Sequence, residues 1–224
     1  MGLHDPPALH DEGPWQAARR KGAAAAAGHL GDEAAARRAL DDADAGVRAA
    51  AVGALVRLGS LASPDLERAR RDPSPLVRRR LAEVAWRAGL TRAALVELAM
   101  TLLSDEAGEV VEAACFCLGE LQAPEAAGAL ATVASAHHDA LCRESAVAAL
   151  GAIAASESLP VILAALEDRA AVRRRAVLAL ASYSGPLVDA ALEHALSDRD
   201  WQVRQAAEDL TSERDLPPPG RAPR

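Results

Sequence analysis

A short motif recurs along the chain at nearly constant spacing, and this repetition restricts the fold more than any other feature. In each copy an apolar residue, usually Val, is followed by Arg and then by a run rich in Ala and Leu. The clear copies are Val47-Arg48, Val77-Arg78, Val172-Arg173 and Val203-Arg204, and weaker ones begin near residues 19, 110 and 142. Successive copies start 28 to 33 residues apart. Self-similarity at a period of ~20 to 50 residues indicates a repeat array rather than a globule around one core.

Each copy predicts a pair of helices. After each start, apolar or small residues recur every three or four positions, as in Val47, Val52 and Leu55, which is the pattern of one buried helix face. Another amphipathic helix is predicted before each copy, over 33–40, 65–71, 91–103, 125–135, 159–166 and 187–196. Aromatic residues make up only 2% of the chain while Ala is abundant, a composition that favours helices over sheets. We therefore expect an all-α fold.

The motif and its surroundings resemble the HEAT-repeat family, in particular the short bacterial HEAT-like repeats of the phycobilisome lyase type. In that family an acidic residue precedes a Val-Arg pair and an Ala-rich helix, as Asp72 precedes Val77-Arg78 here. The resemblance implies a right-handed α-α superhelix, or solenoid, of about six helical-hairpin repeats plus a partial N-terminal cap repeat. It covers residues 15–211. We expect a flexible arm over 1–14 and a disordered Pro-rich tail over 212–224.

The acidic residues and arginines of the motif predict a structural ladder. An Asp just before a helix caps free backbone N–H groups and interacts favourably with the positive end of the helix dipole. The Arg after the buried Val can then reach an acidic group of the neighbouring repeat. The expected ladder residues are Asp44, Arg48, Asp72, Arg78, Arg143, Arg173, Asp200 and Arg204. Val111 stands where Arg is expected in the fourth repeat, so we expect an interruption there.

We expect a partner to bind along the concave ridge of the second helices, those that carry the motif, because a repeat protein has no single enclosed core. Helical geometry places on that ridge the residues that lie 2, 3, 6 and 10 positions after the first residue of each motif copy. The candidate partner-binding residues are Arg79, Arg80, Glu83, Arg87, Glu112, Phe116, Glu120, Glu144, Arg174 and Arg175. The ridge is thus patterned basic, acidic and basic, with Phe116 as an apolar anchor for a protein or peptide.

Two of these candidates also have a purely structural interpretation. The Arg runs at 78–80 and 173–175 form either a groove for acidic groups or a solvated face paired with nearby acids. Phe116 lies either exposed on the ridge or turned into the seam between helices. Both alternatives remain open at the level of the sequence.

Cysteine and histidine side chains cluster in the middle of the chain. Cys115, Cys117 and Cys142, with His137 and His138, offer the ligand types of a zinc site. Their spacing does not match one, and the three cysteines fall at core-facing offsets where other repeats carry Val or Ala. We therefore expect small buried side chains and no metal.

Charge and composition exclude other classes of protein. The net charge of -7 disfavours nucleic-acid binding, which needs a basic surface. No apolar run is long enough to span a membrane and no signal peptide is visible, so we expect a cytoplasmic protein, monomeric when isolated. No catalytic motif is present, and we predict a non-enzymatic interaction scaffold without a cofactor. The alternative is an accessory chaperone-like or lyase-like subunit of a modifying enzyme, with the catalytic groups on a partner chain.

Overall fold

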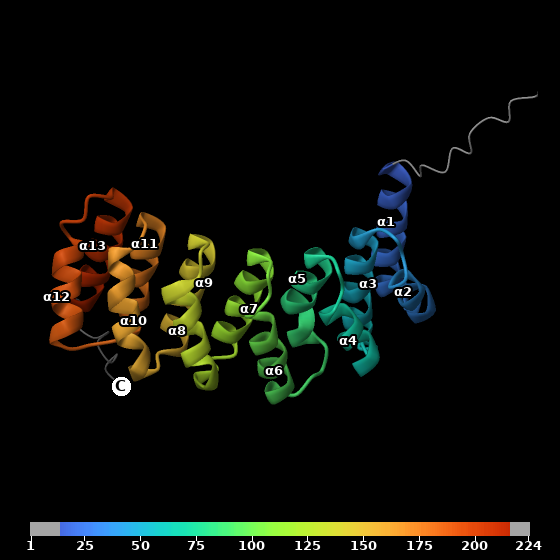
Figure 1. Cartoon of the computed structure of the whole chain (residues 1–224), viewed down its shortest axis with the longest axis horizontal. Helices are drawn as coiled ribbons and strands as arrows, with labels where there is room; N and C mark the ends of the chain where they lie inside the picture. Colours follow the sequence, from blue (N-terminus) through green and yellow to red (C-terminus); the bar gives the residue numbers. More distant parts are fainter. Residues whose placement is uncertain (1–13, 216–224) are drawn as a thin grey trace, which may run out of the picture. The chain divides into compact units, whose positions relative to one another are not determined.

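The computed structural model describes residues 14–215 of the 224-residue chain. Within this range it contains 13 α-helices and five short 3-10 helices, and no strand (Figure 1). The prediction of an all-α repeat fold is confirmed. The chain divides into an N-terminal unit that ends at Gly89 and a C-terminal unit that begins at Leu90.

The N-terminal unit holds the partial first repeat and two complete helix pairs. Its elements are α1 (Pro14–Leu30), α2 (Glu33–Ala39), α3 (Ala45–Leu58), α4 (Ser63–Arg70), α5 (Pro75–Val84) and the 3-10 helix η1 (Ala85–Arg87). The Asp32 and Asp44 side chains cap α2 and α3 by accepting hydrogen bonds from Ala35 N at 2.9 Å and Val47 N at 3.0 Å. These caps start the helices where the acidic residues of the sequence predict them.

The C-terminal unit holds four further helix pairs. Its α-helices are α6 (Arg92–Leu102), α7 (Gly108–Glu120), α8 (Ala127–Ala136), α9 (Ala140–Ile153), α10 (Leu159–Ala164), α11 (Ala170–Ala179), α12 (Pro186–Ala195) and α13 (Trp201–Asp215). Short 3-10 helices adjoin several of them: η2 (Pro124–Ala126), η3 (Ser156–Ser158), η4 (Ala165–Glu167) and η5 (Leu180–Ser182). The even-numbered helices are the first helices of the pairs, and the odd-numbered ones are the second helices that carry the Val-Arg motif.

The second helices pack against one another in chain order, with α1, α3 and α5 in one unit and α7, α9, α11 and α13 in the other. Small residues allow close approach at three of these contacts. A Cβ atom built on Gly28 would lie 2.8 Å from Ala54 Cα, one on Gly119 would lie 3.1 Å from Ala149 Cα, and one on Gly151 would lie 2.7 Å from Ala179 Cβ. The high Ala and Gly content is therefore a packing requirement of neighbouring second helices.

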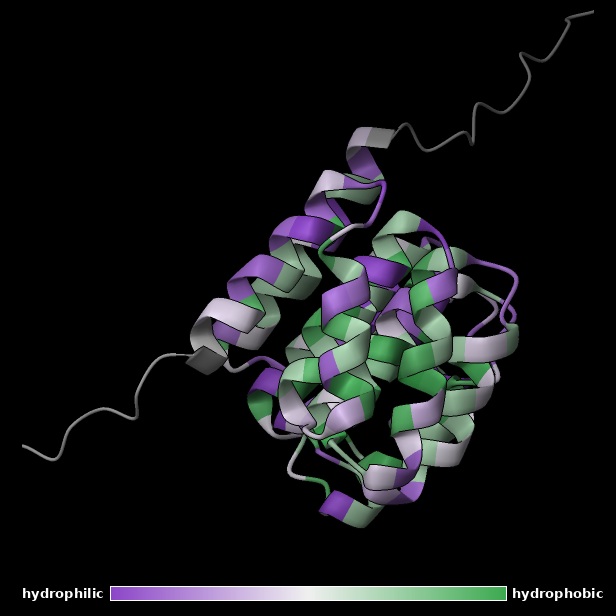
Figure 2. Cartoon of the chain, turned by 90° about the vertical axis from the view of Figure 1, so that its left-hand side faces the viewer, coloured by the Kyte–Doolittle hydropathy of each residue, from purple (hydrophilic) through white to green (hydrophobic). Residues whose placement is uncertain are grey.

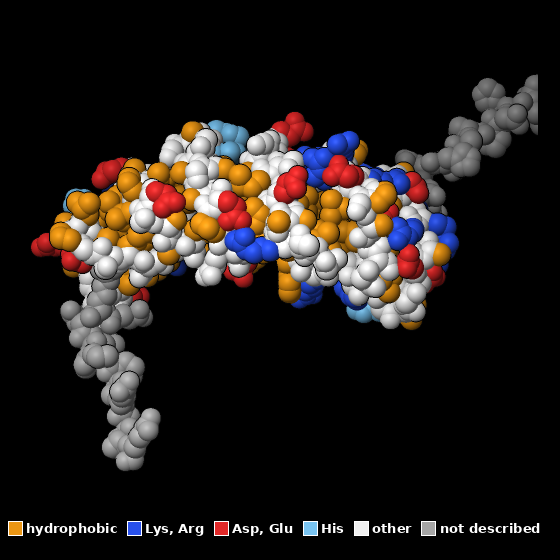
Figure 3. All heavy atoms as spheres, turned by 90° about the horizontal axis from the view of Figure 1, so that it is seen from below, with side chains coloured by type: hydrophobic (Ala, Val, Ile, Leu, Met, Phe, Trp, Pro, Cys, Tyr) orange, Lys and Arg blue, Asp and Glu red, His pale blue; other side chains and the backbone are white. Residues whose placement is uncertain are grey.

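The core is a layer between helices rather than one central cluster. Its largest fully buried side chains are leucines, valines and one isoleucine, spaced along the repeats from Val47 to Leu192. Hydrophobic and hydrophilic residues alternate around the helices in Figure 2, as expected for amphipathic elements. Many apolar side chains also remain on the surface, as the space-filling view of one face shows (Figure 3).

The described helices reach slightly past the expected ends of the repeat region, since α1 begins at Pro14 and α13 continues to Asp215. The remainder of the expected arm and of the expected Pro-rich tail lies outside the described residues. Among the described helices, none is both long and apolar enough to cross a lipid bilayer.

Candidate functional site

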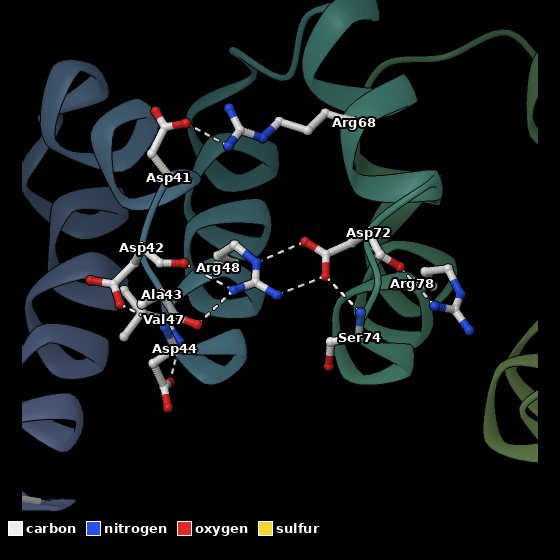
Figure 4. A network of polar contacts seen from close by, with 10 residues as sticks. All are labelled: Asp41, Asp42, Ala43, Asp44, Val47, Arg48, Arg68, Asp72, Ser74 and Arg78. Atoms are coloured by element: carbon white, nitrogen blue, oxygen red, sulfur yellow. Dashed lines mark hydrogen bonds and ion pairs between the residues drawn. The ribbon is translucent and has the colours of Figure 1, made fainter.

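The motif arginines and a set of aspartates form a regular polar network between repeats. Arg48 donates from Nε and Nη2 to the two carboxylate oxygens of Asp72, both at 2.8 Å (Figure 4). Arg143 pairs in the same way with Asp168 at 2.7 Å, and Arg173 pairs with Asp198 at 2.8 and 2.7 Å. Each pair joins one repeat to the next. Because each pair is joined by two hydrogen bonds, the orientation of both the guanidinium and the carboxylate is fixed.

Each motif Arg also contacts the loop before its own helix. Arg48 Nη1 donates to Asp42 O at 2.9 Å and Arg78 Nη1 donates to Asp72 O at 2.7 Å. Asp72 therefore binds Arg48 through its carboxylate and Arg78 through its carbonyl oxygen (Figure 4). The last motif Arg, Arg204, donates to the carbonyls of Asp198 and Arg199. Arg48, Arg143 and Arg173 thus each anchor two consecutive loops.

The aspartates that accept from the arginines differ in part from those expected. Asp72 is in its expected place, but Asp44 and Asp200 serve as helix caps, with Asp200 accepting from Gln202 N at 2.9 Å. The interacting acids are instead those at the start of each loop: Asp42, which pairs with Arg20, and Asp168 and Asp198. An acidic residue five or six positions before the next motif Arg is the sequence signal for this role.

These contacts shift the pKa values of both partners. The Arg143 guanidinium hydrogen-bonded to Asp168 lowers the pKa of that carboxyl below its usual value, against the opposing effect of burial. The hydrogen bond from Arg173 does the same for the pKa of Asp198. The pKa values of both arginines are raised in turn. The network is ionised at neutral pH and is structural in character.

The network has a gap between α7 and α9, and both partners are replaced there. Val111 is fully buried in the position of the motif Arg. His137 occupies the position of the acid, six residues before Arg143. Its Nδ1 accepts a hydrogen bond from Asp139 N at 3.1 Å, so it retains the turn that an aspartate forms elsewhere. Among the described residues, no Arg–Asp pair of this kind joins these two helices.

The N-terminal unit presents a basic hollow of about 360 Å³ on its second helices. Arg79 and Arg80 line it and both donate to Glu83, at 2.8 and 3.3 Å. Its floor consists of small residues on α3: Gly46, Ala49, Ala50 and Gly53. Arg87 lies outside the hollow, where its guanidinium stacks 4.3 Å from the Trp86 ring centroid. The structure thus brings together Arg79, Arg80 and Glu83 of the predicted set, whereas Arg87 lies apart from them.

The C-terminal unit presents a second hollow of about 360 Å³, between α7, α9 and α11. Phe116 and Glu120 of α7 form one side, and Glu144 and Arg175 of α9 and α11 form the other. Phe116 is 67% exposed, so it does not lie in the seam between helices. Arg175 donates to Glu144 at 3.1 Å, which neutralises part of that side. Glu112 and Arg174 do not line this hollow, although Glu112 is one turn from Phe116 on α7.

The three cysteines are buried and unpaired as disulfides. Burial, with neighbouring acids, raises the pKa of Cys115 to about 12 and that of Cys142 to about 11. Glu112, Asp139 and Cys142 each bring one potential ligand atom to within 4.8 Å of the others. The Cys142 thiol donates to Gly108 O at 3.4 Å, however, and a metal binds the thiolate. Cys142 is therefore better suited to pack in the core as a protonated thiol than to bind a metal.

The paired helices, the inter-repeat network and the accessible second-helix face define an α-solenoid repeat protein. A family model of HEAT repeats matches residues 63–151 and 135–210, more than half of the chain. The chain belongs to the HEAT-repeat family.

Solved structures show the same fold. The Escherichia coli protein YibA superposes with a TM-score of 0.64 at 19% identity, over 88% of this chain and 75% of that one. The complex of CpcE and CpcF of phycocyanin lyase from Nostoc sp. PCC7120 gives a TM-score of 0.55 at 21% identity, over 92% and 79%. No curated protein matches the sequence. At these identities the structural similarity establishes the fold alone.

Proposed function

We propose that this protein is a non-catalytic interaction scaffold that binds a partner protein or peptide on the exposed face of its second helices. The observation that carries the proposal is the hollow beside Phe116. A large aromatic ring is 67% exposed above a floor of Gly119, Ala148 and Ala152. Exposed aromatic anchors beside a recess are typical binding hot spots, because a partner that covers them removes a large apolar area from water.

Charge around Phe116 defines which partner would fit. Glu120 lies two helical turns after Glu112 and one after Phe116, and no described residue donates a hydrogen bond to its carboxylate. The stretch 101–224 carries 10 basic and 19 acidic residues, a net charge of -9. A partner segment with an apolar side chain next to Lys or Arg would match this surface.

A narrower form of this proposal is an accessory subunit of a modifying enzyme. It is motivated by the fold shared with CpcE and CpcF, which form a complex with each other in a lyase. In that case the partner is the catalytic chain, and it would contact the same second-helix face. Binding by a non-enzyme partner would favour the general scaffold.

Affinity capture from the native cell extract tests the scaffold function with a closely matched pair of variants. Phe116→Ala removes the exposed ring of α7, whereas Leu187→Ala removes an equally exposed side chain, 68% accessible, from the first helix α12. We expect a partner retained by wild type and Leu187→Ala, and bound about tenfold or more weakly by Phe116→Ala. Equal retention by all three proteins, with unchanged melting temperatures, would contradict the proposal.

A further inference from the structure

Four cationic side chains line the hollow of the N-terminal unit. Lys21 comes from α1, Arg57 from α3, and Arg79 and Arg80 from α5. Glu83 is the one carboxylate among the described residues that line it. The lining therefore carries four positive charges and one negative charge.

Glycines leave room for three of these cationic side chains. A Cβ atom on Gly53 would lie 2.8 Å from Arg80 Nη2, and one on Gly28 would lie 2.9 Å from Arg57 Nη1. A Cβ on Gly46 would lie 3.5 Å from Lys21 Cδ. Two glycines therefore leave the space that a guanidinium occupies, and a third packs against the lysine stem.

The positive charge in the hollow is incompletely neutralised. Arg79 and Arg80 share the single carboxylate of Glu83. No described residue accepts a hydrogen bond from Lys21 or from Arg57. Asp44, the acid near Gly46, uses one carboxylate oxygen to cap α3 at Val47 N. The hollow therefore combines pre-positioned donors with unmatched charge, which favours an anionic ligand.

The spacing of the cations distinguishes an extended ligand from a compact one. Lys21 contacts the start of α3 at Gly46, and Arg80 contacts its middle at Gly53. The Arg57 guanidinium lies beside Gly28 of α1, at the point where Gly28 approaches Ala54 of α3. At ~1.5 Å rise per residue the Lys21 contact is ~10 Å along α3 from the Arg80 contact, and the two guanidinium groups lie near the same level. Alternate residues of an extended peptide lie ~6.6 Å apart on one side. The ~10 Å between the Lys21 contact and the arginines exceeds the width of a single phosphate, whereas about four extended residues span it.

We propose that this hollow binds an extended acidic segment of a partner protein, with carboxylates at alternate positions, along the exposed face of α3. This inference rests on the proposed scaffold function and names the chemistry of one partner segment. The small floor residues Ala49, Ala50 and Gly53 allow the peptide backbone to approach α3, while the arginines contact its acidic side chains.

Fluorescence anisotropy with a labelled peptide of alternating Glu and Ala tests the proposal on the full chain. We expect binding at low salt that weakens as the salt concentration rises. Arg80→Gln should weaken it about tenfold, since a charged hydrogen-bonding partner is lost. Gly53→Ala should weaken it severalfold because its new Cβ displaces the Arg80 guanidinium. The matched controls are Arg38→Gln on α2 and Gly22→Ala on α1, where nothing lies within 4 Å of a new Cβ.

Two competitors complete the experiment. A peptide of the same composition with its Glu residues contiguous should compete at least threefold less well, and inorganic phosphate should compete weakly. Equal competition by either one would overturn the extended-segment proposal in favour of a compact anion site or general charge attraction. Absence of binding, or equal binding by folded Arg80→Gln, would also overturn it. If capture still depends on Phe116 in that case, the scaffold function stands and only this inference fails.

Discussion

At the scale of single residues, an aspartate at the start of the loop before a motif helix connects three parts of the repeat. Asp198 accepts from Arg173 of the preceding repeat through its carboxylate, from Asp200 N at 2.7 Å within its own loop, and from Arg204 through its carbonyl. The side chains of Arg173 and Asp198 are only 6% and 15% exposed. Because both charges are shielded from water, the loss of one leaves the other poorly solvated.

Asp198→Asn should therefore lower the free energy of unfolding by about 1–3 kcal/mol at neutral pH. Asp200→Asn is the matched control two residues away. The Asp200 carboxylate caps α13 at Gln202 N and makes no hydrogen bond to Arg173, and Asn is as good a cap as Asp, so its effect should stay below about 0.5 kcal/mol. Urea unfolding measures both variants. Equal losses would show that the Arg173–Asp198 pair adds nothing beyond the cap.

The same pair predicts a pH dependence. The pKa of Asp198 is lowered in the folded state, so its contribution is complete above the unfolded-state pKa of about 3.9 and is lost as the pH falls through the lower folded-state value. The stability difference between wild type and Asp198→Asn should stay constant from about pH 8 to pH 5 and shrink in more acidic solution. A difference that grows on acidification would contradict this assignment.

At the scale of helices, glycine sets the distance between neighbouring second helices. Gly151 of α9 faces Ala179 of α11, and a Cβ at this position would lie 2.7 Å from Ala179 Cβ and 2.9 Å from its Cα. Those atoms belong to backbone or are attached directly to it, so they cannot rotate away. The helices themselves would have to separate.

Gly151→Ala should lower the free energy of unfolding by about 1–2 kcal/mol, because overpacking outweighs the gain in helix propensity. Gly128→Ala in α8 is the control, since nothing lies within 4 Å of its new Cβ. That variant should be neutral or more stable by up to about 1 kcal/mol. Thermal unfolding of the pair gives the comparison. A stabilised Gly151→Ala would refute the close-packing explanation.

The helix pairs were predictable because their signals are local. Caps, apolar spacing and the Val-Arg motif lie within about 15 residues of each other, and the helices begin within a few residues of the expected positions. The partners in the polar network were less predictable. Asp42 and Asp44, or Asp198 and Asp200, are both acidic and close in sequence, and only the loop conformation decides which one faces the neighbouring Arg.

The hollows were only partly predictable for a similar reason. Helical offsets place Arg79, Arg80 and Phe116 on the exposed face, and the structure has them there. The helical positions do not show which side chains extend from one repeat to the next, or which residues they contact there. Contacts such as Lys21 at Gly46, and the Arg175–Glu144 pair, depend on that crossing.

At the scale of the whole molecule, stability is distributed over contacts between adjacent repeats. The Arg173–Asp198 pair joins α11 to the loop before α13. Asp198→Asn should therefore increase amide hydrogen exchange in α11, α12 and α13, while exchange in α2, α3 and α4 stays unchanged. Exchange measured by mass spectrometry on both proteins gives this map. A uniform increase along the chain would mean that the repeats unfold as one cooperative unit.

The most direct test of the scaffold function is hydroxyl-radical footprinting of the captured complex. Phe116 and Leu187 are equally accessible in the free protein, at 67% and 68%, but lie on a second and a first helix. The proposed function predicts that partner binding protects Phe116 from oxidation and leaves Leu187 as reactive as before. Protection of Leu187 with an unprotected Phe116 would place the partner on the opposite helices and contradict the proposed binding face.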